Sequence, residues 1–141
     1  MDNSNFGITK KERDCLLTIK RISSSDFPVK LSELSRSMKI KPPTALELVS
    51  RLEKKGLVKK NKGMIVLTER GKKIYRSIVF IHRVFEYFLV NCGVDLQEAC
   101  NKASKFDYIL DEKIARLIFQ KIGQPNKCPH GREILEGNGI I

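Results

Sequence analysis

The chain has 141 residues, of which 41% are hydrophobic and 30% are charged, and its formal net charge is +11. This length and composition are typical of one globular domain or of two small ones. The longest apolar stretch, around residues 78–90, is interrupted by His82, Arg83 and Glu86, which excludes a membrane span. The first residues contain no apolar run, so the sequence predicts no signal peptide and a cytoplasmic protein.

The positive charge is concentrated in the first half of the chain. Residues 1–75 carry 18 Lys and Arg against 8 Asp and Glu, whereas residues 76–141 carry 9 against 8. Such an asymmetry favours a polyanion, above all nucleic acid, as the partner of the first half. The alternative is a solvated lysine-rich surface without a specific partner.

The first elements in chain order are two helices. Thr9 can cap a helix over residues 9–22, and Glu12 stands three residues later, as in a capping box. Turn residues follow, and Ser32 can then cap a short second helix. A turn at residues 39–41 is expected to end it.

A third helix and a hairpin come next. The helix is predicted from Thr44 to Lys55, after two prolines that only the first turn of a helix tolerates, and Gly56 can end it. Two β-prone runs separated by a glycine-containing turn predict a hairpin with a basic tip at residues 59–62. Helix, short helix, turn, helix and basic hairpin is the order of a winged helix-turn-helix.

The second half is predicted to be helical. A long helix should run from Thr68 to about Asn91, a second from Asp95 to about Lys105, and a third over residues 111–121 with an inward face made of Ile114, Leu117 and Ile118. The long helix is apolar around much of its girth and should be buried on more than one side. A second copy of the chain can supply that burial, which predicts a homodimer.

The sequence thus predicts a mainly α-helical protein with a winged helix-turn-helix in residues 1–73 and a helical dimerization domain in residues 74–141. Double-stranded DNA with a palindromic operator is the expected partner. Lys41 can reach phosphate or guanine, and Glu47 can accept from cytosine or remain a solvated acid. Predicted base-edge contacts at the start of the third helix are Lys41, Pro43, Thr44 and Glu47, and predicted phosphate contacts are Lys39, Lys59, Lys60 and Lys62.

Other chemistry has little support in the sequence. It contains no glycine-rich phosphate loop and no nucleophile motif, and its two histidines are His82 and His130, so we expect no enzyme. None of the four cysteines forms a C-x-x-C pair, which argues against a zinc ribbon and for reduced thiols.

Five stretches resemble the iron- and manganese-dependent repressor family of the DtxR/MntR type: KIKPPTALELVSRLEKKGLV, VLTERGKKI, IHRVFEYFL, LDEKIARLI and CPHGREI. The resemblance covers roughly residues 8–135. It implies a winged helix-turn-helix, a helical dimerization domain, and a divalent metal ion that links the first helix to that domain and favours DNA binding. Some members add an SH3-like domain, which we do not expect at this length.

The resemblance also implies the metal ligands. The family positions that hold acceptable ligands here are Asp14, His82, Glu86, Cys100 and Asp107. The primary metal site of the family is depleted, because three further ligand positions are occupied by Leu17, Ser104 and Tyr108.

His82 and Glu86 stand at i and i+4 and share one helix face, as a bound ion requires. A histidine, a carboxylate and the thiolate of Cys100 suit zinc, iron or cobalt better than manganese. The alternative is a local ion pair between His82 and Glu86, with Cys100 as a small buried apolar group. In the CPHG stretch, Cys128 and His130 are potential ligands without a clear partner, so no site is predicted there.

Two functional hypotheses follow. The first is a transcriptional regulator, expected to be a repressor, that is controlled by a divalent ion. The ion can be iron, manganese, zinc or cobalt. The second is a metal-independent regulator on the same scaffold, which can respond to thiol chemistry through Cys15, Cys92 or Cys100.

Overall fold

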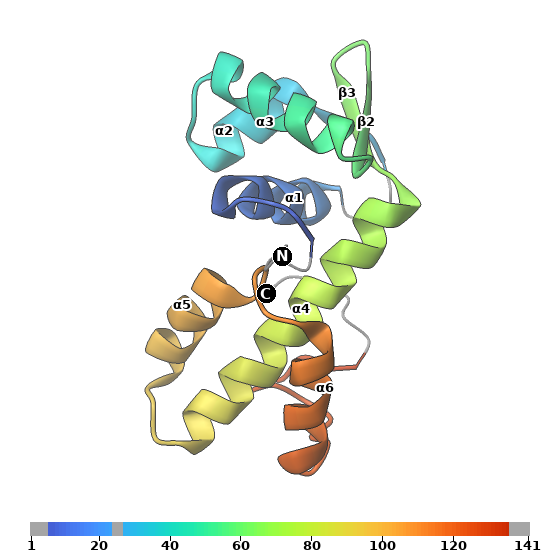
Figure 1. The fold of residues 1–141 in the computed structure, drawn as a ribbon. Coiled ribbons are helices and arrows are strands. Elements are labelled where there is room, and N and C mark those ends of the chain that lie inside the picture. The colour runs from blue at the N-terminus through green and yellow to red at the C-terminus, as the bar shows by residue number, and fades with distance from the viewer. Residues whose placement is uncertain (1–5, 24–26, 136–141) are drawn as a thin grey trace. The chain divides into compact units, whose positions relative to one another are not determined.

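The structure is a computed structural model that describes residues 6–23 and 27–135. It is mainly α-helical with one small sheet, as predicted (Figure 1). No helix in the described part of the chain is both long enough and apolar enough to cross a membrane. The elements in order are α1 (Lys10–Ile22), β1 (Val29–Lys30), α2 (Leu31–Met38), α3 (Pro42–Lys54), β2 (Val58–Asn61), β3 (Met64–Leu67), α4 (Glu69–Asn91), α5 (Leu96–Phe106) and α6 (Glu112–Lys121).

The chain divides into two compact units. One comprises residues 9–75, and the other comprises residues 76–135 together with residues 6–8. The division falls inside α4, so this helix contributes its first two turns to one unit and the remainder to the other.

The unit of residues 9–75 begins with a capped helix. The hydroxyl of Thr9 accepts a hydrogen bond from the backbone N–H of Glu12 at 3.2 Å, which confirms the predicted N-cap of α1. The buried carboxylate of Glu12 accepts hydrogen bonds from Nζ of Lys55 at 2.6 and 3.0 Å. This side chain therefore joins α1 to the residue that follows α3.

The start of α2 differs from its prediction. Lys30, not Ser32, is the N-cap of α2, and it makes no side-chain capping bond. The reason is the two-residue strand β1, which was not predicted: Val29 pairs with Ile65 of β3 and keeps the backbone extended up to Lys30. The helix can begin only after that pairing ends. A strand of two residues has too few positions to show alternation in a sequence.

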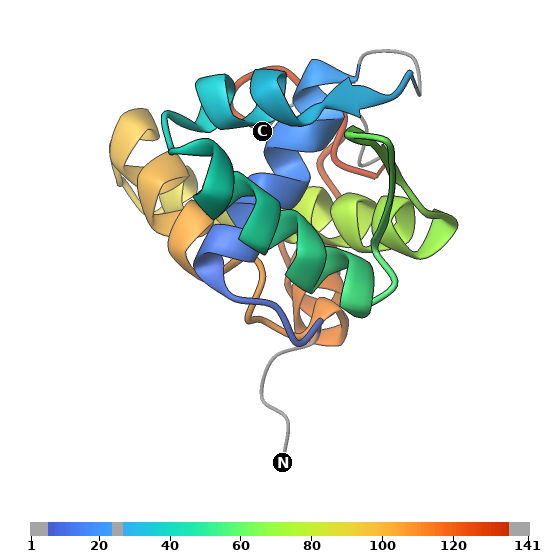
Figure 2. The same ribbon diagram turned by 90° about the horizontal axis from the view of Figure 1, so that it is seen from above.

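The helix-turn-helix and the wing are formed as predicted (Figure 2). Helix α3 starts two residues earlier than expected, because both prolines lie in its first turn, where no backbone donor is needed. Lys62 and Gly63 connect β2 to β3 with φ of 52° and 77°, the left-handed pair that a tight two-residue hairpin turn requires. The backbone N–H of Lys60 donates to the Glu53 carboxylate at 2.9 Å, which attaches the wing to α3.

Gly71 lies where α4 passes very close to the chain before the wing. A Cβ on Gly71 would lie 2.1 Å from the backbone carbonyl oxygen of Leu57. We expect Gly71→Ala to lower the free energy of unfolding by roughly 1–3 kcal/mol, because the backbone must shift to admit one methyl group. Lys73→Ala, exposed on the same helix, is the matched control and should change stability by about 0.5 kcal/mol at most. Denaturant unfolding measures both, and equal stabilities would contradict the close approach.

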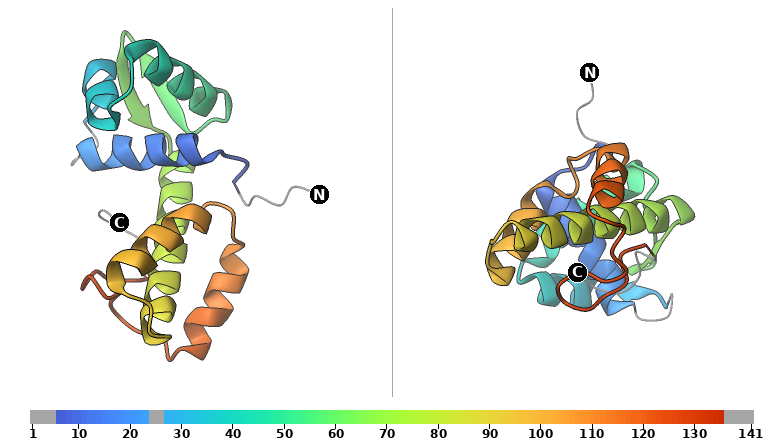
Figure 3. Two further views of the ribbon diagram at one scale, coloured as in Figure 1. Left: turned by 90° about the vertical axis from the view of Figure 1, so that its left-hand side faces the viewer. Right: turned by 90° about the horizontal axis from the view of Figure 1, so that it is seen from below.

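The unit of residues 76–135 packs α5, α6 and the segment after α6 against α4 (Figure 3). The Phe80 ring on α4 meets the Phe119 ring on α6 edge-on at 5.6 Å between centroids, and Phe85 meets Phe106 of α5 at 5.1 Å. Much of the apolar girth of the long helix is therefore covered by the same chain, and not by a second copy. The core of this unit is formed by Phe80, Ile81, Val84, Ala115, Phe119, Cys128 and Ile134.

The predicted inward face of α6 is wrong in part. Ile114 and Leu117 are 49% and 65% exposed, and Ile118 is only partly buried. Ala115 and Phe119 are buried instead. These two residues are one turn apart on the side that meets α4, and on a helix with 3.6 residues per turn Ile114 and Leu117 then point away from it.

Candidate metal centre and nucleic-acid interface

His82 is the centre of a polar cluster inside the unit of residues 76–135. Its side chain is 1% exposed, and its Nδ1 lies 3.0 Å from Oδ2 of the fully buried Asp107, which follows α5. Its Nε2 lies 3.3 Å from Oε2 of Glu86 and 3.6 Å from Sγ of Cys100. One ring nitrogen is thus held by a carboxylate, while the other faces a carboxylate and a thiol.

Two of the separations between these donor atoms, those from Nε2 of His82, suit a tetrahedral ion. Metal bonds of about 2.0–2.1 Å to nitrogen and oxygen and about 2.3 Å to sulfur place two tetrahedral ligands about 3.4 Å apart for N and O, and about 3.6 Å for N and S. The corresponding distances here are 3.3 Å and 3.6 Å. We call His82, Glu86 and Cys100 the His82 site. The donors that the sequence places on α4 and α5 therefore fit a divalent ion.

The two remaining predicted ligands are placed differently. Asp107 contacts Nδ1 of His82, whereas Glu86 and Cys100 face the other ring nitrogen, Nε2. Asp107 is therefore placed to orient the His82 ring and lies outside the group of donor atoms. Asp14 belongs to the unit of residues 9–75, where its carboxylate accepts from Lys10 at 2.6 Å and from Arg13 at 2.9 Å. Neither acid belongs to a potential ligand group in the described residues.

A second donor group lies on the other side of Glu86. Oε1 of Glu86 is 2.8 Å from Nδ1 of His130, and one donor atom each of Glu86, Cys128 and His130 lie within 4.8 Å of one another. We call these three residues the His130 site. The sequence showed no partner for Cys128 and His130, because Glu86 is more than 40 residues earlier and no local spacing links it to them.

The carboxylates around His82 affect its protonation. Burial disfavours the charged ring, but the hydrogen bonds to Asp107 and Glu86 outweigh burial and raise the pKa of His82. Burial likewise acts against charge on Glu86, yet hydrogen bonds from His82 and His130 lower the pKa of this carboxyl. In the absence of an ion, the site therefore favours a protonated His82 beside an ionised Glu86.

This protonation predicts the pH dependence of metal binding. A metal ion binds only the neutral ring of His82, so protons compete with the ion. Because the pKa of His82 is raised, this competition begins at a higher pH than it would at an ordinary histidine. We expect the zinc affinity of the His82 site to fall as the pH falls through that raised pKa, with proton release on binding. Calorimetry in buffers of different ionisation enthalpy measures the release, and binding without proton release would contradict the assignment.

Cys15 is the most deeply buried of the three predicted thiols. Its side chain, in α1, is fully buried. This burial is the main cause that raises the pKa of Cys15 to about 12, and the nearby charges of Glu12 and Asp14 add to it. Because the thiolate is the nucleophile, we expect a thiol reagent at mildly alkaline pH to modify the exposed Cys92 in the folded protein, and Cys15 only after unfolding. Peptide mapping by mass spectrometry tests this expectation. Modification of Cys15 in the folded protein would restore it as a candidate thiol sensor.

All predicted DNA contacts except Lys60 are exposed. Along α3 the buried side is formed by Ala45, Leu48, Val49 and Leu52, as predicted. The opposite side is exposed at the residues expected to meet base edges, which are Lys41, Pro43, Thr44 and Glu47. Leu46, 39% exposed, was not predicted and adds an apolar contact to the same stretch. The N-terminal half of α3 thus presents short, basic and apolar side chains together.

Two details refine this surface. The Glu47 carboxylate forms an ion pair with Arg51 one turn later. Of its two predicted roles, a contact to cytosine or a solvated acid, this local partner favours the second. Lys39 ends α2 in a left-handed conformation and is exposed. In the wing, Lys59 and Lys62 are exposed, and Lys60 is half-buried.

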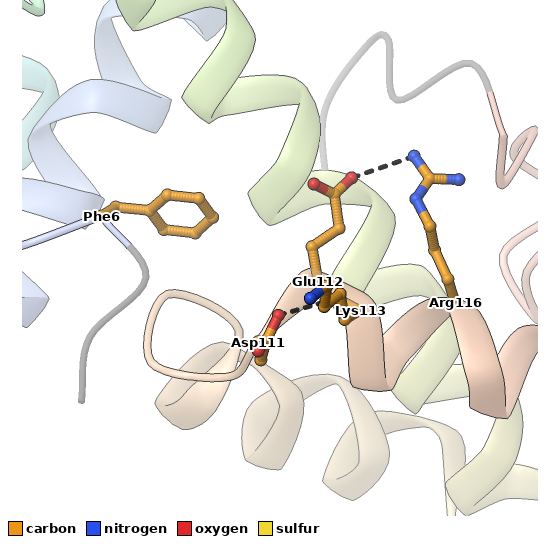
Figure 4. A pocket seen from close by; sticks show the side chains of 5 residues that line it. All are labelled: Phe6, Asp111, Glu112, Lys113 and Arg116. Atoms are coloured by element: carbon orange, nitrogen blue, oxygen red, sulfur yellow. Dashed lines mark hydrogen bonds and ion pairs between the residues drawn. The ribbon is translucent and has the colours of Figure 1, made fainter. Parts of the chain in front are cut away.

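A further hollow lies beside the start of α6 (Figure 4). It has a volume of about 310 Å³ and is lined by Phe6, Asp111, Glu112, Lys113 and Arg116. Its polar groups bind one another: Asp111 caps α6 through the N–H of Lys113, and Glu112 pairs with Arg116 at 3.1 Å. It contains none of the predicted site residues.

Comparison with known proteins extends the similarity over nearly the whole chain. Residues 8–64 match the iron dependent repressor N-terminal DNA-binding domain, and residues 68–136 match the iron dependent repressor metal-binding and dimerisation domain. An uncharacterized helix-turn-helix transcriptional regulator of Aeropyrum pernix is 29% identical over 77% of this chain and 61% of its own length. The iron-dependent repressor IdeR of Mycobacterium tuberculosis is 28% identical over 65% of this chain.

The chain spans 61% of the length of the Aeropyrum regulator and 41% of the length of IdeR. A crystal structure of a hypothetical protein from Sulfolobus solfataricus matches with a TM-score of 0.80 and 39% identity, over 90% of this chain and 98% of that one. The matched domains, the winged helix-turn-helix and the cluster on α4 lead to one conclusion. The chain belongs to the iron-dependent repressor family of transcriptional regulators.

Proposed function

We propose that this regulator binds operator DNA under the control of a divalent ion held at the His82 site. The observation that carries the proposal is that Nε2 of His82, oriented by a buried carboxylate, lies at tetrahedral separations from Glu86 and Cys100. Imidazole, carboxylate and thiolate suit zinc, iron(II) or cobalt better than manganese. The relatives include a repressor named for its iron dependence, which supports metal control.

Within the chain, each donor has a defined role. Asp107 holds the His82 ring so that Nε2 faces Glu86 and Cys100. His82 and Glu86 belong to α4 and Cys100 to α5, so an ion bound to all three joins these two helices. The ion supplies positive charge to a buried carboxylate and a thiolate. Three protein ligands leave a fourth position for water or another donor.

The DNA-binding part of the proposal rests on α3 and the wing. The exposed start of α3 has the composition of a helix that meets base edges, and the basic wing has that of a phosphate contact. We propose double-stranded DNA with a palindromic site as the target. A homodimer presents two such helices related by a twofold axis, which is the symmetry that a palindrome requires.

The homodimer has two lines of support. Residues 68–136 match a domain model that is described as a dimerisation domain. Large apolar side chains also remain exposed on the unit of residues 76–135: Phe88, Ile109, Ile114, Leu117 and Leu135. Light scattering after size-exclusion chromatography should give twice the mass of one chain. A monomer at micromolar concentration would contradict this part of the proposal.

The test combines metal content with DNA binding. An operator is selected from random duplexes, and its affinity is measured by fluorescence anisotropy before chelation, after chelation, and after addition of zinc or iron(II). We expect bound metal in the purified protein and lost operator binding on chelation. Cys100→Ser keeps the side-chain size but removes the thiolate, so it should abolish the response, whereas the exposed neighbour variant Asn101→Ala should keep it.

Other outcomes are equally informative. Undiminished operator binding without metal would overturn metal control and support a metal-independent regulator on this scaffold. Binding that ignores chelation but is lost on oxidation would support the thiol-responsive alternative, in which Cys92 and Cys100 are more accessible than the buried Cys15.

A further inference from the structure

Leu46 is a large apolar side chain on the exposed face of α3. In the described part of the unit of residues 9–75, the large hydrophobic side chains that remain exposed are Phe27 and Leu46, and only Leu46 lies in a helix. The core does not need it, because α3 already has a complete buried face. That face is formed by Ala45, Leu48, Val49 and Leu52.

The backbone at the start of α3 has no hydrogen-bond donor to spare. Pro42 and Pro43, which open the helix, lack an N–H group. The next two N–H groups, those of Thr44 and Ala45, both donate to the carbonyl oxygen of Lys41, at 3.0 and 3.1 Å. Over residues 42–45, a base or phosphate can therefore be contacted by side chains alone.

The two carboxylates on the exposed side of α3 already have partners. Glu53 accepts from the backbone N–H of Lys60 in the wing at 2.9 Å, and Glu47 pairs with Arg51. Successive residues of an α-helix turn by about 100°, which places Arg51 about 140° from Leu46 around the axis. The ion pair therefore draws the Glu47 carboxylate away from Leu46.

The surface around Leu46 is thus apolar and contains few hydrogen-bonding groups. Leu46 comes three residues after the exposed Pro43, a spacing that places two side chains side by side on a helix. In a major groove, thymine differs from the other bases by its 5-methyl group, which is recognised by apolar contact. A leucine side chain gains from burying that methyl group, whereas it leaves the polar edge of another base without a partner.

We propose that Leu46 is a specificity-determining residue that selects thymine through contact with its 5-methyl group. The inference rests on the proposed function, because it requires α3 to lie in a major groove of the operator. Burial of one methyl group changes an affinity by about fourfold. The two equivalent contacts of a palindromic site multiply to about 15-fold.

The experiment replaces each thymine of the selected operator, together with its symmetry mate, by deoxyuridine, which lacks only the methyl group. Anisotropy titrations of the full chain, under the conditions of the selection, give the ratio of affinities for the thymine and uracil duplexes. For the wild type we expect a ratio of about 15 at one thymine pair. Leu46→Ala should lower this ratio to about 1, and Leu46→Gln, which keeps the size of the side chain, should lower it as well.

The matched control is the wing variant Lys59→Gln with Lys62→Gln. It removes two exposed charges from the same unit, so it should weaken binding to both duplexes and keep the wild-type ratio. Because Leu46 is exposed and outside the buried face of α3, Leu46→Ala should match the wild type in circular dichroism and thermal unfolding.

A second set of duplexes tests the source of the methyl group. 5-Methylcytosine carries the same group, so each cytosine of the operator is replaced by it in turn. The affinity of the wild type should not rise at any position, because a thymine already occupies the position that Leu46 contacts. A rise that Leu46→Ala abolishes would overturn the choice of thymine.

The outcomes separate this inference from the proposed function. If no thymine methyl group affected the wild type, or if Leu46→Ala remained as sensitive as the wild type, Leu46 would not select thymine, although operator binding would stand. A wild type that binds no duplex would overturn both.

Discussion

Replacement of Asp107 by Asn should lower the affinity for Zn²⁺ by about 10–100-fold, although Asp107 lies outside the donor group of the His82 site. Asp107 is fully buried and accepts a hydrogen bond from Nδ1 of His82. Its negative charge fixes the tautomer that leaves Nε2 available to the ion and makes that nitrogen more basic. Asn keeps the shape and an acceptor but removes the charge, so the ring loses orientation and basicity together.

Competition with a chromophoric chelator measures this affinity directly. Glu98→Gln is the matched control, because it removes one negative charge from an exposed position on α5. It should leave the affinity unchanged. Because a purely structural role of Asp107 would reduce stability but not the affinity of the folded protein, unfolding is measured on the same samples. Equal zinc affinities for Asp107→Asn and the wild type would refute the orienting role.

The combined change Lys59→Gln and Lys62→Gln should weaken binding to every duplex by the same factor. These two lysines are exposed on the wing, where their expected contacts are phosphates and not base edges. Each lost phosphate contact releases about one fewer counterion, so the slope of log affinity against log salt should become shallower by about two. The preference for the operator over random DNA should not change.

Anisotropy titrations over a range of salt concentrations test this prediction. The control is Lys102→Gln with Lys105→Gln, which removes the same charge from exposed positions on α5. It should leave the slope close to the wild-type value. If the wing variant retained both the wild-type slope and affinity, the wing would not contact DNA. A change in sequence preference would mean that the wing meets bases.

Several features of this protein were determined by local sequence alone. The cap at Thr9, the start of α3 at its two prolines, the turn at Lys62 and Gly63, and the long helix each depend on residues within one or two turns of one another. Contacts between residues this close in sequence form whenever the element forms. The pairing of His82 with Glu86 is of the same kind, because a helix places residues i and i+4 on one face.

Tertiary structure decided the features that depend on which side of an element faces a neighbour. Strand β1 exists because Val29 reaches Ile65, and α6 turns Ala115 and Phe119 inward although Ile114 and Leu117 are more apolar in total. The assignment of Asp107 as a partner of His82, and of Asp14 to Lys10 and Arg13, likewise depends on contacts that a ligand pattern does not specify.

The His130 site shows most clearly what spacing in the sequence cannot predict. Cys128 and His130 follow Glu86 by more than 40 residues, and their meeting requires α6 and the turn after it to fold back along α4. Spacing in a sequence reports neighbours on one helix or in one turn, so it identified the His82 side of Glu86 and not the other. Packing of the core around Cys128 brings the distant donors to the same carboxylate, and no periodic pattern in the chain encodes that approach.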